Sequence, residues 1–375
     1  MSRSMRVGLL TGGGDCPGLN AVIRAVTKSL IRGQGAEVIG FEDGFLGLIE
    51  QRSRSLSFSD VSGILTQGGT ILGASNKANP YGYYKRGGAD VSAKVVQYCK
   101  SLKLDAVVAI GGDGTMSIAN RLHNQGVPMI GVPKTIDNDL VGTDRTFGFD
   151  SAVTIAAEAI DRIHTTAQSH HRIMIVETMG RYAGWIALYA GVASGADIIL
   201  IPELPFEVEE VISACEDRAQ RGQRFTIIAV AEGARAKNGD MVVNRTVSDS
   251  PDRIRLGGVG RVLEEQIRDH VRSEVRTSVL GHMQRGGTPT PFDRTLSSAF
   301  GAYAAAMAAQ QLTGHMVALQ GNQLTSIPLE EVADAHRTVP LDDPMLATAQ
   351  AVDTSFGVKD FSVTMTGSEP VGPLS

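Results

Sequence analysis

Short apolar runs alternate with stretches of helical periodicity along most of this chain. The apolar runs typical of buried strands in its first part are residues 7–11, 37–41, 105–110 and 129–132. The stretches between them that space apolar residues as amphipathic helices do are 20–31, 91–102 and 116–124. Strands and helices that alternate at this spacing predict a mostly parallel sheet with helices on both faces.

A second series of the same kind follows a long predicted helix at residues 151–168. Its expected strands are 172–177, 197–201, 225–231 and 276–280. Its expected helices are 184–192, 208–221, 258–270 and 293–312. The polar stretch 234–254 predicts an exposed excursion, 329–335 a short helix, and 367–375 a loose tail. The fold class is therefore α/β.

The most unusual polar stretch is Pro-Lys-Thr-Ile-Asp-Asn-Asp at residues 133–139, directly after an expected strand. In open α/β sheets, ligands bind at the carboxyl ends of the strands. A polar loop with Asx turns is the alternative, but a turn needs only one Asp or Asn. Here two carboxylates, a hydroxyl, an amide and an ammonium group occur within seven residues. The stretch therefore predicts a binding or catalytic loop.

Two glycine-rich turns follow other expected strands. Gly-Gly-Asp-Gly-Thr occupies residues 111–115, and Gly-Gly-Gly-Asp-Cys-Pro-Gly occupies residues 12–18. A strand, a glycine turn and a helix together offer backbone N–H groups and a helix N-terminus to a phosphate. The turn at residues 12–18 has the spacing of neither a dinucleotide fingerprint nor a Walker P-loop, and glycine turns without a ligand are common after first strands. Together with the carboxylate-rich loop, they predict a phosphate and metal site.

Three side chains in these loops suit phosphoryl transfer. Asp113 lies between glycines, and a carboxylate there suits Mg²⁺, which proteins usually hold with one or two carboxylates and substrate phosphates. Asp137 is the best candidate for the base that deprotonates an attacking hydroxyl. Lys134 can act as a point charge on a phosphate.

Basic residues recur beside the later strands. Arg181 follows a strand and is placed to point a guanidinium at transferring phosphoryl oxygens. The set that could clamp a phosphomonoester is Arg172, Arg276, His282 and Arg285. For any single arginine, a solvated surface charge is the simpler interpretation. The pattern as a whole predicts Mg²⁺-dependent phosphoryl transfer onto a small anionic substrate, which the residues alone do not identify.

The composition indicates which partners and which cellular compartment to expect. The net charge of −5 and the pI near 5.9 argue against a nucleic-acid partner or a polybasic membrane anchor. The three cysteines lack metal-ligand spacing and cannot all pair, so reduced thiols in a cytosol are expected. No run approaches the ~18 apolar residues of a membrane span, and the first residues do not resemble a signal peptide. We therefore expect a cytoplasmic protein with no membrane contact.

Five segments of the chain resemble motifs of the 6-phosphofructokinase family, in family order over residues 6–320 or so. They are Thr11-Gly-Gly-Gly-Asp-Cys-Pro-Gly-Leu-Asn20, Gly111-Gly-Asp-Gly-Thr115, Pro133-Lys-Thr-Ile-Asp-Asn-Asp139, Glu177-Thr-Met-Gly-Arg-Tyr182 and Leu280-Gly-His-Met-Gln-Arg-Gly-Gly287. The second segment alone is also similar to lipid and NAD kinases. The third and fifth separate the families.

The resemblance implies ATP-dependent phosphorylation of the 1-hydroxyl of fructose 6-phosphate, a step of glycolysis, with Mg²⁺ as cofactor. Asp137 would accept the hydroxyl proton, Thr135 and Arg181 would steady the phosphoryl group, and Asp113 would hold Mg²⁺. The residues that would line the nucleotide site are Gly14, Gly112, Asp113, Gly114 and Thr115. Those that would bind the sugar phosphate are Met179, Gly180, Arg181, Glu232, His282 and Arg285.

The resemblance also implies the architecture. It gives two Rossmann-like α/β domains with mostly parallel sheets and the active site in the cleft between them. Residues 1–150, completed by about 275–320, would bind nucleotide and Mg²⁺, 151–274 would bind the sugar phosphate, and 321–375 would be an extension. Arg172 and Arg276 would reach the sugar phosphate of a neighbouring subunit, so a homodimer or homotetramer is implied.

The phosphoryl donor is the point on which the sequence departs from a simple pattern. Asn76 and Lys77 stand where the family commonly has an arginine beside the nucleotide. Lys134 resembles the pyrophosphate-using relatives, whereas Gly114 is the ATP-type residue. Gly114 weighs more, because an aspartate there would crowd and repel a nucleotide phosphate. ATP is the expected donor, and pyrophosphate is the alternative.

Two other functions stay open. A sugar-phosphate-sensing regulatory subunit could keep the fold without catalysis, although intact Asp113, Asp137 and Arg181 argue against it. An NAD or lipid kinase is a more distant alternative. Arg24 and Lys28 partly resemble a bacterial regulatory site, which does not identify an effector.

Overall fold

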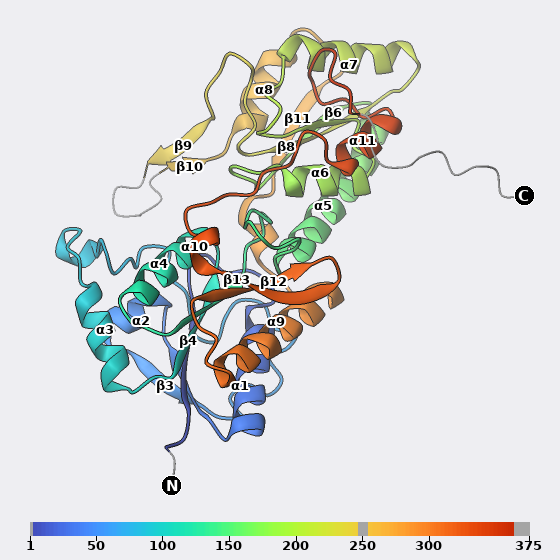
Figure 1. Ribbon diagram of the computed structural model, residues 1–375. Helices are drawn as coiled ribbons and strands as arrows, with labels where there is room; N and C mark the ends of the chain where they lie inside the picture. Colours follow the sequence, from blue (N-terminus) through green and yellow to red (C-terminus); the bar gives the residue numbers. More distant parts are fainter. Residues whose placement is uncertain (1–2, 247–253, 364–375) are drawn as a thin grey trace, which may run out of the picture. The chain divides into compact units, whose positions relative to one another are not determined.

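The structure, a computed structural model, describes residues 3–246 and 254–363 (Figure 1). The chain forms two compact units. The first contains Met1–Ala152 and Arg285–Arg337, and the second contains Val153–Arg245, Ile254–Gln284 and the chain from Thr338 onward. The helix α5 (Phe149–His170) begins in the first unit and continues into the second. The expected extension is divided between the units at residue 337, and the domain functions stay a prediction.

The first unit is built on a seven-stranded sheet of order β13-β12-β5-β4-β1-β2-β3. Its strands are β1 (Arg6–Thr11), β2 (Glu37–Phe41), β3 (Ser53–Leu56), β4 (Ala106–Gly111), β5 (Met129–Pro133), β12 (His315–Gln320) and β13 (Gln323–Pro328). The pairings β1–β2, β1–β4, β4–β5 and β5–β12 are parallel, and an antiparallel strand closes each edge. The strand order reverses at β1 and β4, which is where open α/β sheets form a binding crevice.

Helices cover both faces of this sheet (Figure 1). One face carries α1 (Leu19–Gln34) and α9 (Pro291–Ala309), which pack against each other. The other face carries α2 (Phe45–Glu50), α3 (Ser92–Ser101), α4 (Asp113–Asn124) and α10 (Leu329–Val332). The core on this second face joins side chains such as Phe45, Val95 and Met116 to the apolar strands. Because the apolar faces of the helices and the sheet are buried against each other, the strands are held in place. The direction in which the loops leave the strand ends is therefore fixed as well.

The second unit has a four-stranded, all-parallel sheet of order β11-β6-β8-β7. Its strands are β6 (Ile173–Thr178), β7 (Ile198–Leu200), β8 (Thr226–Ala231) and β11 (Val275–Val279). The helices α7 (Val208–Gln220) and α8 (Val259–Ile267) bury apolar residues on one face. The helix α6 (Trp185–Ala193) packs on β7 and β8, and α11 (Pro344–Ala351) packs on α6.

The predicted α/β class, the mostly parallel sheets and the expected strands are confirmed. Three features were not expected. The edge strand β3 is polar and mostly exposed, so its sequence carries no apolar run. The β12–β13 hairpin turns at Gly321-Asn322, a dipeptide typical of two-residue hairpin turns. The helix α11 begins at Asp343, whose carboxylate accepts a hydrogen bond from the Met345 N–H at 2.8 Å.

The remaining expectations concern the end of the chain and its polar excursion. Within 234–254, part of the chain pairs as the two-stranded sheet of β9 (Val243–Thr246) and β10 (Ile254–Leu256). The predicted tail at 367–375 lies outside the described residues.

The described part of the chain contains no helix with the length and apolar character that crossing a membrane requires. All three cysteines are free thiols and buried.

Candidate active site

Three loops meet at the carboxyl ends of β1, β4 and β5 in the first unit. Backbone hydrogen bonds join them: the Gly12 N–H donates to the Ile110 carbonyl at 2.8 Å, and the Lys134 N–H donates to the Gly111 carbonyl at 2.9 Å. The Lys134 ammonium also donates to the Gly14 carbonyl at 2.5 Å. The two glycine turns and the 133–139 loop therefore form one connected edge, as expected for strand ends near a switch point.

Glycine is required where the first two loops approach Thr115. A Cβ atom at Gly12 would lie 2.5 Å from the Thr115 Oγ1, and one at Gly111 would lie 2.2 Å from it. Thr115 is buried, at the first turn of α4, and cannot move away easily. Any larger residue at either glycine would push the loops apart and displace the start of α4.

Asp113 and Gly114 form the N-terminal turn of α4. The Asp113 side chain is half-exposed, and a carboxylate is favourable at the positive end of a helix. A Cβ atom at Gly114 would have no neighbour within 4 Å, and this glycine has no positive φ. The backbone at position 114 is therefore open to a ligand and tolerates a side chain without strain.

A pocket of about 300 Å³ lies over the first glycine turn. Its lining residues are Gly13, Gly14, Asp15, Thr70, Ala74 and Asn76. The Arg285 guanidinium lies at its edge: Nη1 donates to the Asp15 carbonyl at 3.3 Å and would be 2.8 Å from a Cβ atom on Gly14. Arg285, which the resemblance placed on the sugar phosphate, therefore contacts the glycine turn within the first unit.

The 133–139 loop is held in a tight turn. The Asp137 N–H donates to the Thr135 hydroxyl at 3.1 Å, and the Thr146 hydroxyl donates to the Thr135 carbonyl at 2.7 Å. Asn138 has φ of 52°, and its buried side-chain oxygen accepts a hydrogen bond from the Thr146 N–H at 3.0 Å. Asparagine tolerates this left-handed conformation better than most residues. The turn fixes Asp137 beside Thr135.

The loop concentrates negative charge. Burial, together with the negative charges of Asp137 and Asp113, raises the pKa of Asp139 to about 7, while the Thr135 hydroxyl lowers it. Three carboxylates that influence one another in this way favour a nearby cation or a shared proton. Lys134, only 4% exposed, supplies a positive charge at the same edge, although burial lowers its pKa.

The donor set fits Mg²⁺ held together with phosphates. No group of three or more His, Cys, Asp and Glu side chains within the described residues converges on one metal position. At the start of α4 the site offers the half-exposed Asp113 carboxylate to a cation, rather than a complete cage of protein ligands. Mg²⁺ is usually bound in this way in phosphoryl-transfer sites, with substrate oxygens and water as the other ligands.

In the second unit, another group of predicted site residues lies at the carboxyl ends of β6, β8 and β11. The Glu232 N–H donates to the Thr178 carbonyl at 2.9 Å, and the Gly233 N–H donates to the Gly180 carbonyl at 3.1 Å. The Met179 N–H donates to the Gln284 side chain at 3.3 Å, in the 3₁₀ turn η2 (Gly281–Arg285). These bonds bring Met179, Gly180, Arg181, Glu232 and His282 to one sheet edge.

Arg172 and Arg276 lie at the amino ends of the strands of the same sheet, opposite the carboxyl ends that carry the group above. Arg172 precedes β6, and Arg276 is the second residue of β11, beside Met174 in the parallel register. Both guanidinium groups contact the Glu274 carboxylate, and their side chains are 28% and 51% exposed. A six-residue strand is roughly 20 Å long. Within one chain, these arginines therefore cannot join the residues at the carboxyl ends of β6 and β11.

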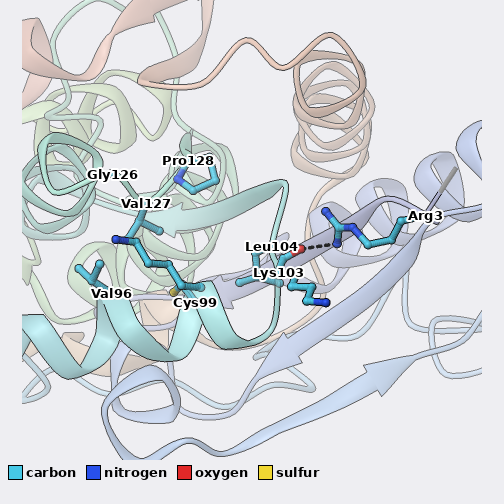
Figure 2. Close-up of a pocket in the computed structure, with 9 residues that line it drawn as sticks. Arg3, Val96, Cys99, Lys103, Leu104, Gly126, Val127 and Pro128 are labelled. Carbon is cyan, nitrogen blue, oxygen red and sulfur yellow. Dashed lines mark hydrogen bonds between the residues drawn. The ribbon is translucent and has the colours of Figure 1, made fainter.

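A second cavity, of about 240 Å³, lies at the amino ends of β4 and β5 (Figure 2). Figure 2 shows Val96, Cys99, Leu104 and Val127 around it, with the Arg3 guanidinium bound to the Lys103 carbonyl. Burial raises the pKa of the Cys99 thiol to about 12, which disfavours the reactive thiolate. The cavity is at the wrong end of the strands to take part in the site above.

Two residues near the site were given no role from the sequence. Asp139 belongs to the recognised loop, and it stands out because burial and the charges of Asp137 and Asp113 raise its pKa to about 7. His336 lies more than 200 residues from Asp113 in sequence, yet its Nε2 is 3.7 Å from the Asp113 Oδ2. No local motif marks this contact, because it depends on the path of the chain after α10.

Fold and site together define an α/β protein with glycine turns and carboxylates at the switch point of a parallel sheet. The chain belongs to the phosphofructokinase family: the family model described as Phosphofructokinase matches residues 6–308. This agrees with the family that the five motifs resembled.

Relatives with two different donor names match almost the whole chain. The chain is 48% identical to the ATP-dependent 6-phosphofructokinase 2 of Clostridium perfringens, over 94% of this chain and 98% of the relative. It is 49% identical to the pyrophosphate–fructose 6-phosphate 1-phosphotransferase of Amycolatopsis methanolica, over 90% and 96%. The structure of phosphofructokinase from Saccharomyces cerevisiae matches with a TM-score of 0.76 and 28% identity, over 93% of this chain and 47% of that one. The chain thus spans about half the length of the yeast protein.

Proposed function

We propose that this protein transfers a phosphoryl group from ATP to the 1-hydroxyl of fructose 6-phosphate, giving fructose 1,6-bisphosphate in a Mg²⁺-dependent reaction. The observation that carries the proposal is the connected edge of the first unit. It combines two glycine turns, a half-exposed Asp113 and the Thr135–Asp137 turn. Relatives of both donor types carry names for phosphoryl transfer to fructose 6-phosphate or for a 6-phosphofructokinase.

In this proposal the first unit provides the donor site and the base. Asp137 accepts the proton of the attacking hydroxyl, and the Thr135 hydroxyl steadies the phosphoryl group. Gly14, Asn76, Lys77, Gly112, Gly114 and Thr115 line the nucleotide site. Bound at Asp113, Mg²⁺ would neutralise charge on the donor phosphates.

The second unit would hold the acceptor. Met179, Gly180, Glu232 and His282 bind fructose 6-phosphate, and Arg181 stabilises charge on the transferring group. The hydrogen bonds between the loops after β6 and β8 support this grouping, because they place these residues at one sheet edge. Arg285, which lies beside Gly14 in the first unit, would also bind fructose 6-phosphate.

ATP is the donor that the site supports best. The open space at Gly114 leaves room for the α-phosphate and ribose, which pyrophosphate lacks. One observation favours the alternative donor: the buried Lys134 ammonium lies under the glycine turn, where it can attract a small polyanion. A pyrophosphate-dependent phosphofructokinase is therefore the second candidate function.

Replacing Lys134 should separate the two donors. Lys134→Gly removes the ammonium that supports Gly14, so we expect lower activity with either donor. The relative loss should be larger for pyrophosphate, because a smaller anion has fewer other contacts to hold it. The measurement is kcat/KM for ATP and for pyrophosphate at saturating fructose 6-phosphate. An equal loss for both would assign Lys134 to loop support alone.

We also propose that the active protein is a homodimer or homotetramer with shared sites. Arg172 and Arg276 lie at the amino edge of the second unit's sheet, about a strand length from the other sugar-phosphate residues. If they bind the sugar phosphate, they do so in a neighbouring subunit. Both side chains are partly exposed, and each would exchange its contact with Glu274 for the sugar phosphate.

Complementation between inactive variants tests the shared site. An Arg276→Ala chain mixed with an Asp137→Asn chain should form some sites in which both residues are wild type. We expect activity to return on mixing, up to about a quarter of the wild-type value if dimers form at random and each site takes one residue from each chain. Each variant mixed with itself is the control. If labelled subunits exchange but no activity returns, Arg276 does not act across the boundary.

The experiment that tests the proposed reaction is product identification. The purified protein is incubated with fructose 6-phosphate, Mg²⁺ and either ATP or pyrophosphate, and the products are analysed by ³¹P NMR. We expect the resonances of fructose 1,6-bisphosphate with ATP, and none when a chelator removes the metal. A sugar product phosphorylated elsewhere, or donor hydrolysis without sugar phosphorylation, would overturn the proposal.

The three buried free thiols support a reducing compartment, so we place the reaction in the cytoplasm.

A further inference from the structure

The chain that follows α10 contacts two loops of the candidate donor site of the first unit. Residues 334–337, called here the 334–337 segment, leave the helix through a sharp turn at Asp334, whose φ is 60°. A positive φ at a residue other than glycine is uncommon and marks a backbone that its surroundings hold in place. The segment then runs past the two loops that carry Asp113 and Asp137.

Three contacts attach the segment to these loops. The Asp334 N–H donates to the Ser117 hydroxyl at 3.0 Å, and that hydroxyl donates to the Asp113 carbonyl at 3.1 Å. At the other end, the Arg337 N–H donates to the Asp139 carbonyl at 2.7 Å. The Arg337 guanidinium also donates to the Asp144 carbonyl at 2.8 Å. The segment therefore links the first turn of α4 to the loop that follows β5.

His336 lies between these two attachment points. Its Nε2 is 3.7 Å from the Asp113 Oδ2, and the two side chains are 39% and 47% exposed. Asp334 and Arg337, on either side of His336, donate hydrogen bonds from their backbone N–H groups, whereas Asp113 belongs to a half-exposed helix end. The ring is thus presented to the carboxylate by a segment whose backbone is already ordered.

We propose that His336 is a positioning residue that orients the Asp113 carboxylate for the divalent cation. The inference rests on the proposed function, in which Asp113 holds the cation. A carboxylate on a helix end has rotational freedom, and the His336 ring, 3.7 Å away, restricts that freedom before the metal arrives. Residues that hold a ligating carboxylate in this way typically change metal affinity about 10–100-fold when they are lost.

Metal binding measured without turnover is the primary test. Mn²⁺ replaces Mg²⁺, and β,γ-imido-ATP replaces ATP, so that no reaction occurs. The enhancement of water-proton relaxation reports only Mn²⁺ that the protein holds, and its titration gives the dissociation constant of the Mn²⁺–nucleotide complex. We expect His336→Ala to weaken this complex about tenfold or more. The wild type should bind the Mn²⁺–nucleotide complex most tightly, His336→Gln less tightly and His336→Ala least tightly.

Two variants separate positioning from a general loss of structure. His336→Gln keeps a donor near the Nε2 position and should restore most of the affinity. His315→Ala is the matched control, because His315 lies beside Ile130 near the start of β5, at the opposite end of the sheet. It should leave the affinity unchanged. Thermal unfolding of each variant confirms that the fold is retained.

The contact between Ser117 and Asp334 gives an independent check. If the segment acts through His336, Ser117→Ala should weaken binding of the Mn²⁺–nucleotide complex in the wild-type background. The same substitution should cause a smaller loss of affinity when His336→Ala is already present. Fully additive effects would mean that Ser117 acts on Asp113 only through its own hydrogen bond.

The outcomes distinguish this inference from the proposed function. If the wild type phosphorylates fructose 6-phosphate but His336→Ala binds Mn²⁺–nucleotide as tightly as the wild type, the positioning role is wrong and the proposed function stands. His336→Ala could weaken the binding of metal-free β,γ-imido-ATP as much as it weakens the binding of the Mn²⁺–nucleotide complex. In that case His336 contacts the nucleotide, and the inference is overturned. If the wild type transfers no phosphoryl group with either donor, the proposed function fails independently of the Mn²⁺ result.

Discussion

Asp137→Asn is expected to reduce kcat by about 10²–10⁴-fold, the usual contribution of a general base. The amide keeps the shape of the side chain but cannot accept the hydroxyl proton. The turn should survive the change, because its hydrogen bonds use the backbone N–H of residue 137 and the side chains of Thr135 and Asn138. KM for fructose 6-phosphate should therefore change much less than kcat.

The matched control for this variant lies in the same part of the chain. Asp144→Asn makes the same isosteric change at an exposed carboxylate that accepts a hydrogen bond from the Gly321 N–H. We expect it to retain normal turnover. Steady-state kinetics at saturating donor measures both variants, and Asp137→Asn with near-normal kcat would contradict the role of Asp137 as base.

Gly114→Asp is expected to reduce kcat/KM for ATP by at least two orders of magnitude. Two unit charges ~4 Å apart near a protein surface interact by about 4 kcal/mol, and an aspartate here would face an anionic phosphate. The new side chain meets no protein atom within 4 Å of its Cβ, so the fold should tolerate it. Pyrophosphate use should suffer much less, because pyrophosphate has no ribose or third phosphate to place there.

Two further variants show which physical effect is responsible. Gly114→Asn adds the same bulk without the charge, so it should cost less than Gly114→Asp if repulsion dominates. Gly33→Asp places a carboxylate on another open, helical glycine in α1 and should leave both donors unaffected. The measurement is kcat/KM for each donor in all four proteins. A Gly114→Asp variant that uses ATP as well as the wild type does would remove Gly114 as a determinant of donor choice.

The sequence predicted the parts of the fold that apolar periodicity controls. The strands β4 and β5 are buried at every position, and their continuous apolar runs predicted them. The polar edge strand β3 and the short helix α11 depend on pairing or capping rather than on a continuous apolar pattern. They are the elements for which tertiary context outweighs local signals.

The site shows the same division. The glycine turns and the 133–139 loop could be recognised because their chemistry is concentrated in a few consecutive residues. The burial of Lys134 beneath Gly14 and the approach of His336 to Asp113 could not, because each joins residues that are far apart in sequence. The position of Arg172 and Arg276 at the amino edge of a parallel sheet also needed the strand register, which fixes them away from Met179 and His282.

The most direct test of the central claim is the initial rate of fructose 1,6-bisphosphate formation from fructose 6-phosphate with Mg²⁺ and either ATP or pyrophosphate at equal concentration. We predict rapid formation with ATP, a clearly lower kcat/KM with pyrophosphate, and no reaction in the presence of a chelator. A higher kcat/KM with pyrophosphate would show that Lys134 outweighs Gly114 in donor choice. No fructose 1,6-bisphosphate with either donor would contradict the proposed function itself.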